Sequence, residues 1–193
     1  MKKIKKIIAI LNIPRFVFHI IFYMFTKDKM RMDIVNNSVA YECNSLLHAL
    51  LILLTFDKTF RNLFYYRIGP VSHLISFLAP PCETFIIGSH AKIGEGFRPA
   101  HCYSTVVNAE RIGENFMVYQ CVTIGMNAGK CPSFGDDVVV FSNSVIMGGI
   151  TIGNHVRVGA GSVVCKSVPA NCVVVGNPAH IIRKDGVKCN ERL

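Results

Sequence analysis

The sequence predicts a mainly β protein in which a parallel β-helix follows an N-terminal α-helical segment. From residue 87 onward, a large apolar side chain recurs every six residues and is often followed by glycine. Between residues 45 and 66, by contrast, apolar residues recur at helical spacing until Gly69-Pro70 ends the run. A short fixed period is the sequence signature of a solenoid. The expected divisions are 1–80 (helical), 81–170 (β-helix) and 171–193 (closing segment and basic tail).

The period of six explains how the coil is built. An α-helix repeats its apolar residues every 3.6 positions and a strand every second position, so six fits neither. Each unit instead forms a short strand and a turn, and three units close a triangular coil of about eighteen residues. The apolar residue points inward, and the glycine after it is expected to serve the turn, where unusual φ and ψ angles occur. The inward positions are Ile87, Ile93, Ile112, Val118, Ile124, Phe134, Val140, Ile146, Ile152, Val158 and Val164.

The period is interrupted twice, and insertions in a solenoid usually carry its binding work. The step from Ile124 to Phe134 is ten residues long, so residues 126–133 are expected to form an outward loop. The other interruption lies between the second and third repeats. One extra residue is present there, and His101 and Cys102 stand where inward aliphatic side chains are expected.

Most of the net charge of +9 lies at the N-terminus, where residues 1–32 hold eight basic side chains and one acid. The same stretch is apolar from residue 7 to 25 but is interrupted by Pro14, Arg15 and His19, with no small-residue cleavage site. These features argue against a signal peptide and against a spanning helix. A basic, apolar segment suits a membrane surface more than a nucleic acid. Two interpretations stay open, a helix on the membrane surface or one packed against another subunit.

The eight cysteines are irregularly spaced and form no C-x-x-C pair. This pattern predicts buried free thiols in a reducing compartment rather than disulfides or a zinc site. We therefore expect no metal and a cytoplasmic protein, with attachment to the inner face of the membrane left open.

Four motifs resemble a known family. They are AKIGEGFRPAHCYSTVVN, IGENFMVYQCVTIG, FGDDV after the loop, and GGITIGNHVRVGAGSVVCKSVPANCVVVGNPAHII. With them, residues 87–182 resemble the serine-acetyltransferase-like branch of the hexapeptide acyltransferases, which includes polysaccharide O-acetyltransferases. The resemblance implies a left-handed β-helix, acetyl-CoA as the acetyl donor, a hydroxyl acceptor and no metal. It also implies a homotrimer with sites between subunits, which sedimentation as a monomer would contradict.

His101 matches the histidine that serves as general base in this family. Histidine suits proton removal from a hydroxyl because its pKa lies near the working pH. Gln120 is a weak candidate for stabilising the oxyanion. Glu83, eighteen residues before His101, is either the carboxylate that orients the imidazole or a solvated residue. A nucleophilic Cys102 is disfavoured, because neighbours on a strand point to opposite faces.

The same resemblance places acetyl-CoA in a groove between coils near the C-terminal end. The implied residues are Gly159, Ala160, Gly161, Ser162, Lys166, Pro178, Ala179 and Arg183. The small residues let the pantetheine approach the backbone, and the cations suit phosphates. Because every coil needs small residues in its turns, a purely structural role fits the glycines as well.

Departures from the family pattern guide the prediction of the acceptor. Serine acetyltransferases have an acid before the histidine and an Arg-His pair in the loop, where this chain has Ala100 and Lys130-Cys131. A sugar hydroxyl needs neither charge, and polysaccharide precursors are carried on membrane lipids. A sugar or polysaccharide precursor is therefore the main hypothesis, and L-serine, for cysteine biosynthesis, is the alternative. A non-catalytic scaffold and a membrane-recruited assembly factor are the non-enzymatic alternatives.

Overall fold

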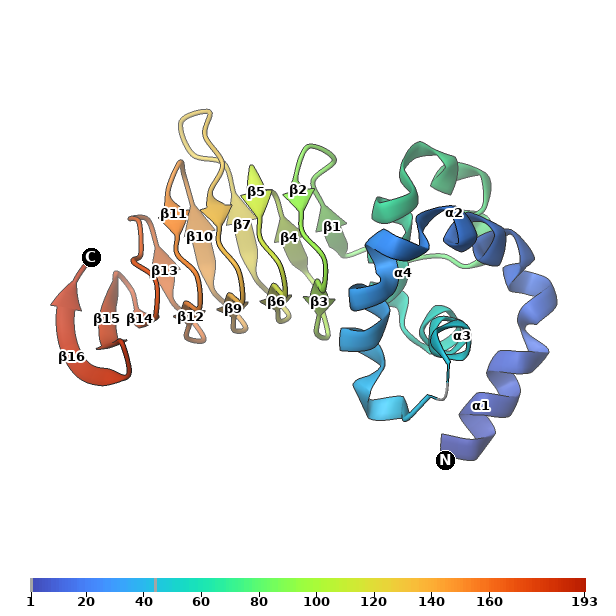
Figure 1. Cartoon of the computed structure of the whole chain (residues 1–193). Helices are drawn as coiled ribbons and strands as arrows, with labels where there is room; N and C mark the ends of the chain where they lie inside the picture. Colours follow the sequence, from blue (N-terminus) through green and yellow to red (C-terminus); the bar gives the residue numbers. More distant parts are fainter. Residues whose placement is uncertain (1, 44) are drawn as a thin grey trace. The chain divides into compact units, whose positions relative to one another are not determined.

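The structure is a computed structural model that describes residues 2–43 and 45–193. The chain divides into two compact units, Met1–Glu83 and Thr84–Leu193. The first unit is helical and the second is a parallel β-helix (Figure 1). The predicted fold class is therefore confirmed.

The helical unit is built around one apolar helix, α3, which packs against α1, α2 and α4. Leucine and isoleucine side chains of α3 are fully buried at its centre, namely Leu50, Ile52, Leu53 and Leu54. Within the described residues the elements are α1 (Lys2–Leu11), α2 (Ile13–Ser38), η1 (Val39–Tyr41), α3 (Leu46–Phe56), α4 (Lys58–Ile68), η2 (Gly69–Leu74) and η3 (Ser76–Leu78).

The stretch 45–66, expected as one helix, forms two helices because Asp57 interrupts it. The backbone at Asp57 is extended, with φ −115° and ψ 101°. Its carboxylate accepts hydrogen bonds from the backbone N–H groups of Thr59 and Phe60, both at 2.9 Å. An acidic side chain that caps free N–H groups in this way stabilises a helix start by about 1 kcal/mol. Gly69, with φ 72°, ends α4 as the sequence predicts.

His19 is a fully buried core residue of the helical unit. Its Nε2 lies 2.9 Å from the hydroxyl of Tyr65, which donates its own proton to the carbonyl of Ala79 at 2.7 Å. Nε2 therefore carries the imidazole proton, and Nδ1 has no hydrogen-bond partner among the described residues. Burial, and then the charges of Arg15 and Arg61, lowers the pKa of His19 to about 4, so the ring is neutral at physiological pH.

The β-helix has three faces joined by three corners. The corner that follows the first face along the chain is called the first corner, and the other two corners are numbered in the same way. The first face contains β1 (Phe85–Ile87), β4 (Thr105–Val107), β7 (Thr123–Gly125), β10 (Val145–Met147) and β13 (Val163–Val164). The second contains β2 (Lys92–Ile93), β5 (Arg111–Ile112), β8 (Ser133–Phe134) and β11 (Thr151–Ile152). The third contains β3 (Arg98–Pro99), β6 (Met117–Val118), β9 (Val139–Val140), β12 (Arg157–Val158) and β14 (Cys172–Gly176). Strands of successive coils pair in parallel on every face.

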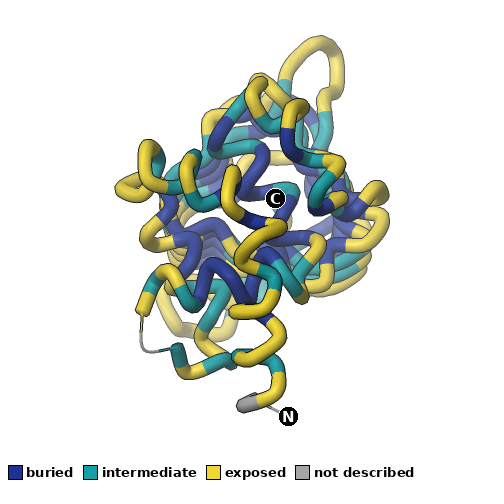
Figure 2. Tube along the Cα trace, turned by 90° about the vertical axis from the view of Figure 1, so that its right-hand side faces the viewer, coloured by how far each residue is buried: buried dark blue, intermediate teal, exposed yellow. Residues whose placement is uncertain are grey.

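The predicted inward residues line the inside of this coil. In the end-on view of Figure 2, exposed chain lies mostly at the outline and buried chain mostly within it. Nine of the eleven are buried, and Ile87 and Ile93 in the first coil are half-buried. Aromatic rings pack against each other between coils, with centroids 5.7 Å apart for Phe97 and Phe116, which are tilted, and 5.1 Å for Phe116 and Phe134, which meet edge to face. The apolar ladder therefore holds successive coils together.

Most of the glycines after inward residues are required by the close approach of coils, which corrects their expected role in the turn. A Cβ added to Gly113 would lie 2.6 Å from the carbonyl of Gly135, yet the φ angle of Gly113 is not positive. At the second corner of each coil, the left-handed conformation occurs two residues after the glycine, in residue types that tolerate it. Those residues are Gly96, Asn115, Asp137 and His155.

Replacing Gly113 with alanine is expected to lower the free energy of unfolding by about 1–3 kcal/mol, because overpacking forces two coils apart. Gly125→Ala is the matched control: Gly125 also follows an inward isoleucine, and its added Cβ would meet no described atom within 4 Å. The control is expected to change stability by less than about 0.5 kcal/mol. Denaturant unfolding followed by circular dichroism measures both variants, and equal effects would contradict this account of the repeat.

The C-terminal segment forms two further strands rather than a tail. β15 (Ala179–Lys184) and β16 (Val187–Arg192) continue the third face in antiparallel fashion after β14. The turn between them is Asp185-Gly186, with φ angles of 48° and 82°. Asp-Gly with two positive φ angles is typical of a tight hairpin.

Candidate active site

The third corner of the first coil contains two extra residues, His101 and Cys102. On the third face Pro99 pairs with Val118, nineteen residues later. On the next face Val107 pairs with Ile124, only seventeen residues later. The single extra residue seen in the sequence is therefore an insertion of two at this corner, followed by a shortening of one before β5. The break in the repeat lies at His101.

The insertion turns His101 outward and Cys102 inward. His101 is exposed and has a φ angle of 55°, a left-handed conformation in which histidine is enriched over most residues. Cys102 is fully buried, and its Sγ lies 3.3 Å from the carbonyl oxygen of Val118. The opposite orientations expected for this pair are confirmed, and they separate the Cys102 thiol from any reaction at the surface.

Aromatic rings and an amide lie beside His101 at the same corner. The N–H of Ala100 donates to the carbonyl of Val118, so Tyr119 and Gln120 occupy the corner on the next coil. The Tyr119 ring stacks on Phe141 of the following coil, with centroids 5.3 Å apart and planes 19° apart. Gln120 is half-buried. The structure thus brings Ala100, His101 and Gln120 to the third corner on two successive coils.

Glu83 does not stand one coil beneath His101. The first coil is offset by twenty residues, since Phe85 pairs with Thr105, and an offset of eighteen was needed to align Glu83 with His101. The same register, continued backward, aligns Glu83 with Tyr103. Glu83 is exposed, in keeping with the alternative that it is a solvated residue.

The loop predicted at 126–133 is present at the first corner and overhangs a groove of about 680 Å³. Asn127 and Lys130 close the loop by two backbone hydrogen bonds, at 3.0 and 3.1 Å. Lys130 and Cys131 line the groove together with His90, Glu110 and Thr151. Because His101 lies at the third corner, one chain does not bring the loop and the histidine together.

A second groove, of about 780 Å³, lies where the last coil meets the C-terminal hairpin. Three of the residues expected to bind acetyl-CoA line it, namely Lys166, Pro178 and Ala179. His180 and Arg192 also line it and were not predicted, because the hairpin that positions Arg192 was interpreted as a tail. The Asp185-Gly186 turn was the sequence signal that identifies the hairpin. The Lys166 ammonium donates to the carbonyl of Leu193 at 2.6 Å.

The other residues expected in that groove lie elsewhere. Ser162 is fully buried, and its hydroxyl donates to the carbonyl of Gly159 at 2.6 Å. The missing side chain of Gly159 leaves space that Val175 of the next strand fills, 2.7 Å from where a Cβ would be. Ala160 and Gly161 are exposed at the third corner. Arg183 is exposed on β15 and does not line the groove.

Metal ligation has no candidate in the described part of the chain, where no three His, Cys, Asp or Glu side chains are grouped to hold an ion. His155 lies 3.5 Å from the carboxylate of Asp137 at the second corner, and both side chains are about half exposed. This pair is a surface contact between coils.

A parallel coil with three faces and a period of six residues is the fold of hexapeptide-repeat proteins. Comparison with known proteins assigns the chain to the same class. The family model described as "Bacterial transferase hexapeptide (six repeats)" matches residues 132–166. A serine acetyltransferase of Synechococcus elongatus is 34% identical over 131 residues, 65% of this chain and 54% of its own length. One of Staphylococcus aureus strain Mu50 is 34% identical over 147 residues, 74% of this chain and 67% of its own length. This chain thus spans between half and two thirds of these relatives.

The fold comparison leads to the same group. The serine acetyltransferase of Neisseria gonorrhoeae superposes with a TM-score of 0.66 at 25% identity, covering 86% of this chain and 67% of that one. The chain belongs to the serine acetyltransferase family of hexapeptide proteins. The family predicted from the four sequence motifs is therefore confirmed.

Proposed function

We propose that the chain is an acetyl-CoA-dependent O-acetyltransferase with His101 as its general base. The observation that carries the proposal is the exposed His101 on the two-residue insertion, the site at which the repeat departs from its own geometry. The relatives, named serine acetyltransferases, support the same reaction class.

The reaction follows from what an imidazole can do beside a hydroxyl and a thioester. His101 removes the hydroxyl proton as the acceptor oxygen attacks the thioester carbonyl, and the oxyanion forms. The C–S bond then breaks, and the imidazolium returns the proton to the CoA sulfur. An acetyl ester and free CoA result, with no acetyl-enzyme. Gln120 stays a candidate for hydrogen bonding to the oxyanion.

We assign the CoA portion to the C-terminal groove. Lys166 and Arg192 place two cations there, which suits the phosphate groups of CoA. Pro178 and Ala179 offer small, apolar contact for the pantetheine arm. A homotrimer stays our prediction, because it gives His101 a neighbouring surface that its own chain does not provide.

L-serine is the acceptor that the relatives favour, in preference to the polysaccharide expected first. A sugar hydroxyl is the second candidate, on two specific observations. Ala100 and Lys130-Cys131 stand where serine acetyltransferases have an acid and an Arg-His pair. The stacked Tyr119 and Phe141 rings lie at the corner of His101, and aromatic faces suit the apolar face of a sugar ring.

CoA release from acetyl-CoA, measured with L-serine and then with a panel of sugars, tests the acceptor. Release that depends on L-serine is expected to exceed release in the absence of acceptor by at least tenfold. Release with a sugar but not with L-serine would overturn the serine assignment and support the second candidate. No acceptor-dependent release with either class would contradict the enzyme assignment and favour a non-catalytic scaffold.

A further inference from the structure

Helix α1 is amphipathic, but it is turned so that its apolar stripe faces solvent. The stripe has helical spacing, and its exposed members are Ile4, Ile7, Ile8 and Leu11. The opposite side contacts the protein: Ala9 is fully buried, and the Lys6 ammonium donates to the carbonyl of Glu42 at 3.0 Å. Lys5 lies over the Tyr41 ring, 5.3 Å from its centroid. An amphipathic helix in a globular protein normally buries its apolar face, so this orientation requires a partner.

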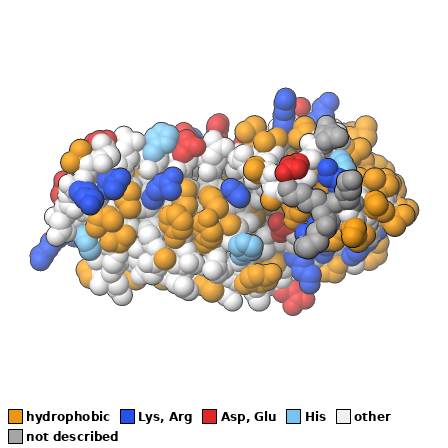
Figure 3. Space-filling model, turned by 90° about the horizontal axis from the view of Figure 1, so that it is seen from below, with side chains coloured by type: hydrophobic (Ala, Val, Ile, Leu, Met, Phe, Trp, Pro, Cys, Tyr) orange, Lys and Arg blue, Asp and Glu red, His pale blue; other side chains and the backbone are white. Residues whose placement is uncertain are grey.

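The first half of α2 repeats the pattern. Its exposed stripe consists of Val17, Phe18, Ile21, Met24 and Phe25, and Phe25 alone is 83% exposed. The opposite face is buried against α3 and α4 through Phe16, His19, Met30 and Ile34. Hydrophobic side chains accordingly gather on the surface of the helical unit (Figure 3). The stripes of α1 and α2 are together called the N-terminal apolar surface.

Basic residues accompany this surface. Exposed Lys27, Lys29 and Arg31 follow Phe25 directly, and Asp28 is the one acid among residues 1–32. Pairing two copies through this surface would bring two strongly basic segments together, which costs electrostatic energy. An anionic lipid surface supplies the opposite charge and an apolar layer at once.

We propose that the N-terminal apolar surface binds the interface of an anionic lipid bilayer, with α1 and the first half of α2 lying in the membrane plane. No single helix of the described chain is long and apolar enough to cross a membrane. The segments Ile4–Leu11 and Ile13–Tyr41 meet that test only as a pair, bent by 79°. Because α2 is packed into the helical unit along its other face, it lies on the bilayer rather than crossing it.

Sedimentation of the full chain with lipid vesicles tests this proposal independently of catalysis. The wild type is expected to sediment with vesicles of phosphatidylcholine mixed with phosphatidylglycerol, and much less with phosphatidylcholine alone. Binding is expected to weaken as salt is raised, because exposed charges are screened. The triple variant Leu11→Ser, Phe18→Ser, Phe25→Ser is expected to bind at least about tenfold more weakly. Val187→Ser is the matched control, because Val187 is 69% exposed in the other unit.

Three results would overturn the proposal. The first is failure of the wild type to sediment with anionic vesicles, and the second is equal sedimentation by the triple variant. The third is a change in oligomeric state of the triple variant without lipid, seen by analytical ultracentrifugation, which would assign the surface to a second copy of the chain. CoA release on a soluble acceptor is expected to be unchanged in the triple variant, which separates membrane binding from the proposed catalysis.

Discussion

Replacing His101 with alanine is expected to lower kcat by about 10²–10⁴-fold, the usual contribution of a positioned general base. The imidazole of His101 is the side chain at the inserted corner that is suited to act as a general base. His101→Asn is expected to show the same loss. Asparagine tolerates the φ angle of 55°, so this variant removes the base while leaving the backbone unstrained. Initial rates of CoA release at saturating acetyl-CoA measure both variants.

Cys102→Ala serves as the control for the insertion itself. Its thiol is buried and lies 3.3 and 3.9 Å from the backbone carbonyl oxygens of Val118 and Tyr119, so its loss is expected to leave kcat within a few-fold of wild type. A large loss in Cys102→Ala with a small one in His101→Asn would contradict the assignment of the base. Unfolding curves of all three variants show whether a lost rate reflects a lost fold.

The fold is predictable from the sequence because each inward position has one physical requirement. Ile124, Ile146 and Val164 must fill the same narrow space on successive coils, so the apolar period survives in the sequence whatever lies outside. The close approach at Gly113 is different, because it depends on a backbone distance between coils that no single sequence position records. A glycine suited to a turn and a glycine forced by close approach are identical in the sequence.

The site is only partly predictable from the sequence. The sequence shows the net change in the length of a coil, but not the corners at which residues are gained or lost. Two residues gained at His101-Cys102 and one lost before β5 leave a net difference of one. Val107 was therefore not among the predicted inward residues, and the register of Glu83 was predicted wrongly. Once the six-residue units are assigned to faces, the corner at which each loop lies follows from their order. This order places Lys130 at the first corner and His101 at the third. Asp57 was also available as a helix cap, but the apolar period on both sides of it favoured one continuous helix.

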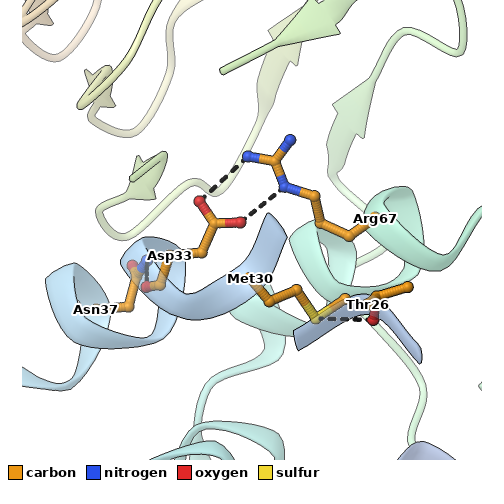
Figure 4. A network of polar contacts seen from close by, with 5 residues as sticks. All are labelled: Thr26, Met30, Asp33, Asn37 and Arg67. Carbon is orange, nitrogen blue, oxygen red and sulfur yellow. Dashed lines mark hydrogen bonds and ion pairs between the residues drawn. The ribbon is translucent and has the colours of Figure 1, made fainter. Parts of the chain in front are cut away.

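Replacing Asp33 with alanine is expected to destabilise the helical unit by about 3–5 kcal/mol, because it leaves the Arg67 guanidinium as a buried charge. Asp33 on α2 and Arg67 on α4 form a two-pronged contact (Figure 4). Nε of Arg67 donates to Oδ2 at 2.7 Å and Nη2 to Oδ1 at 3.1 Å. Their side chains are only 1% and 8% exposed, so water screens the pair little. The contact joins two helices through side chains that are thirty-four positions apart in the chain.

Urea unfolding followed by the helical circular dichroism signal measures this change. Asp28→Ala is the matched control on the same helix, because Asp28 is exposed, and it is expected to shift stability by less than about 0.5 kcal/mol. The double variant Asp33→Leu, Arg67→Met removes both charges and is expected to recover most of the loss, since an apolar pair of similar volume replaces a buried ion pair at little cost. If the double variant is as unstable as the sum of its two single variants, the loss comes from packing around each side chain and not from an uncompensated charge.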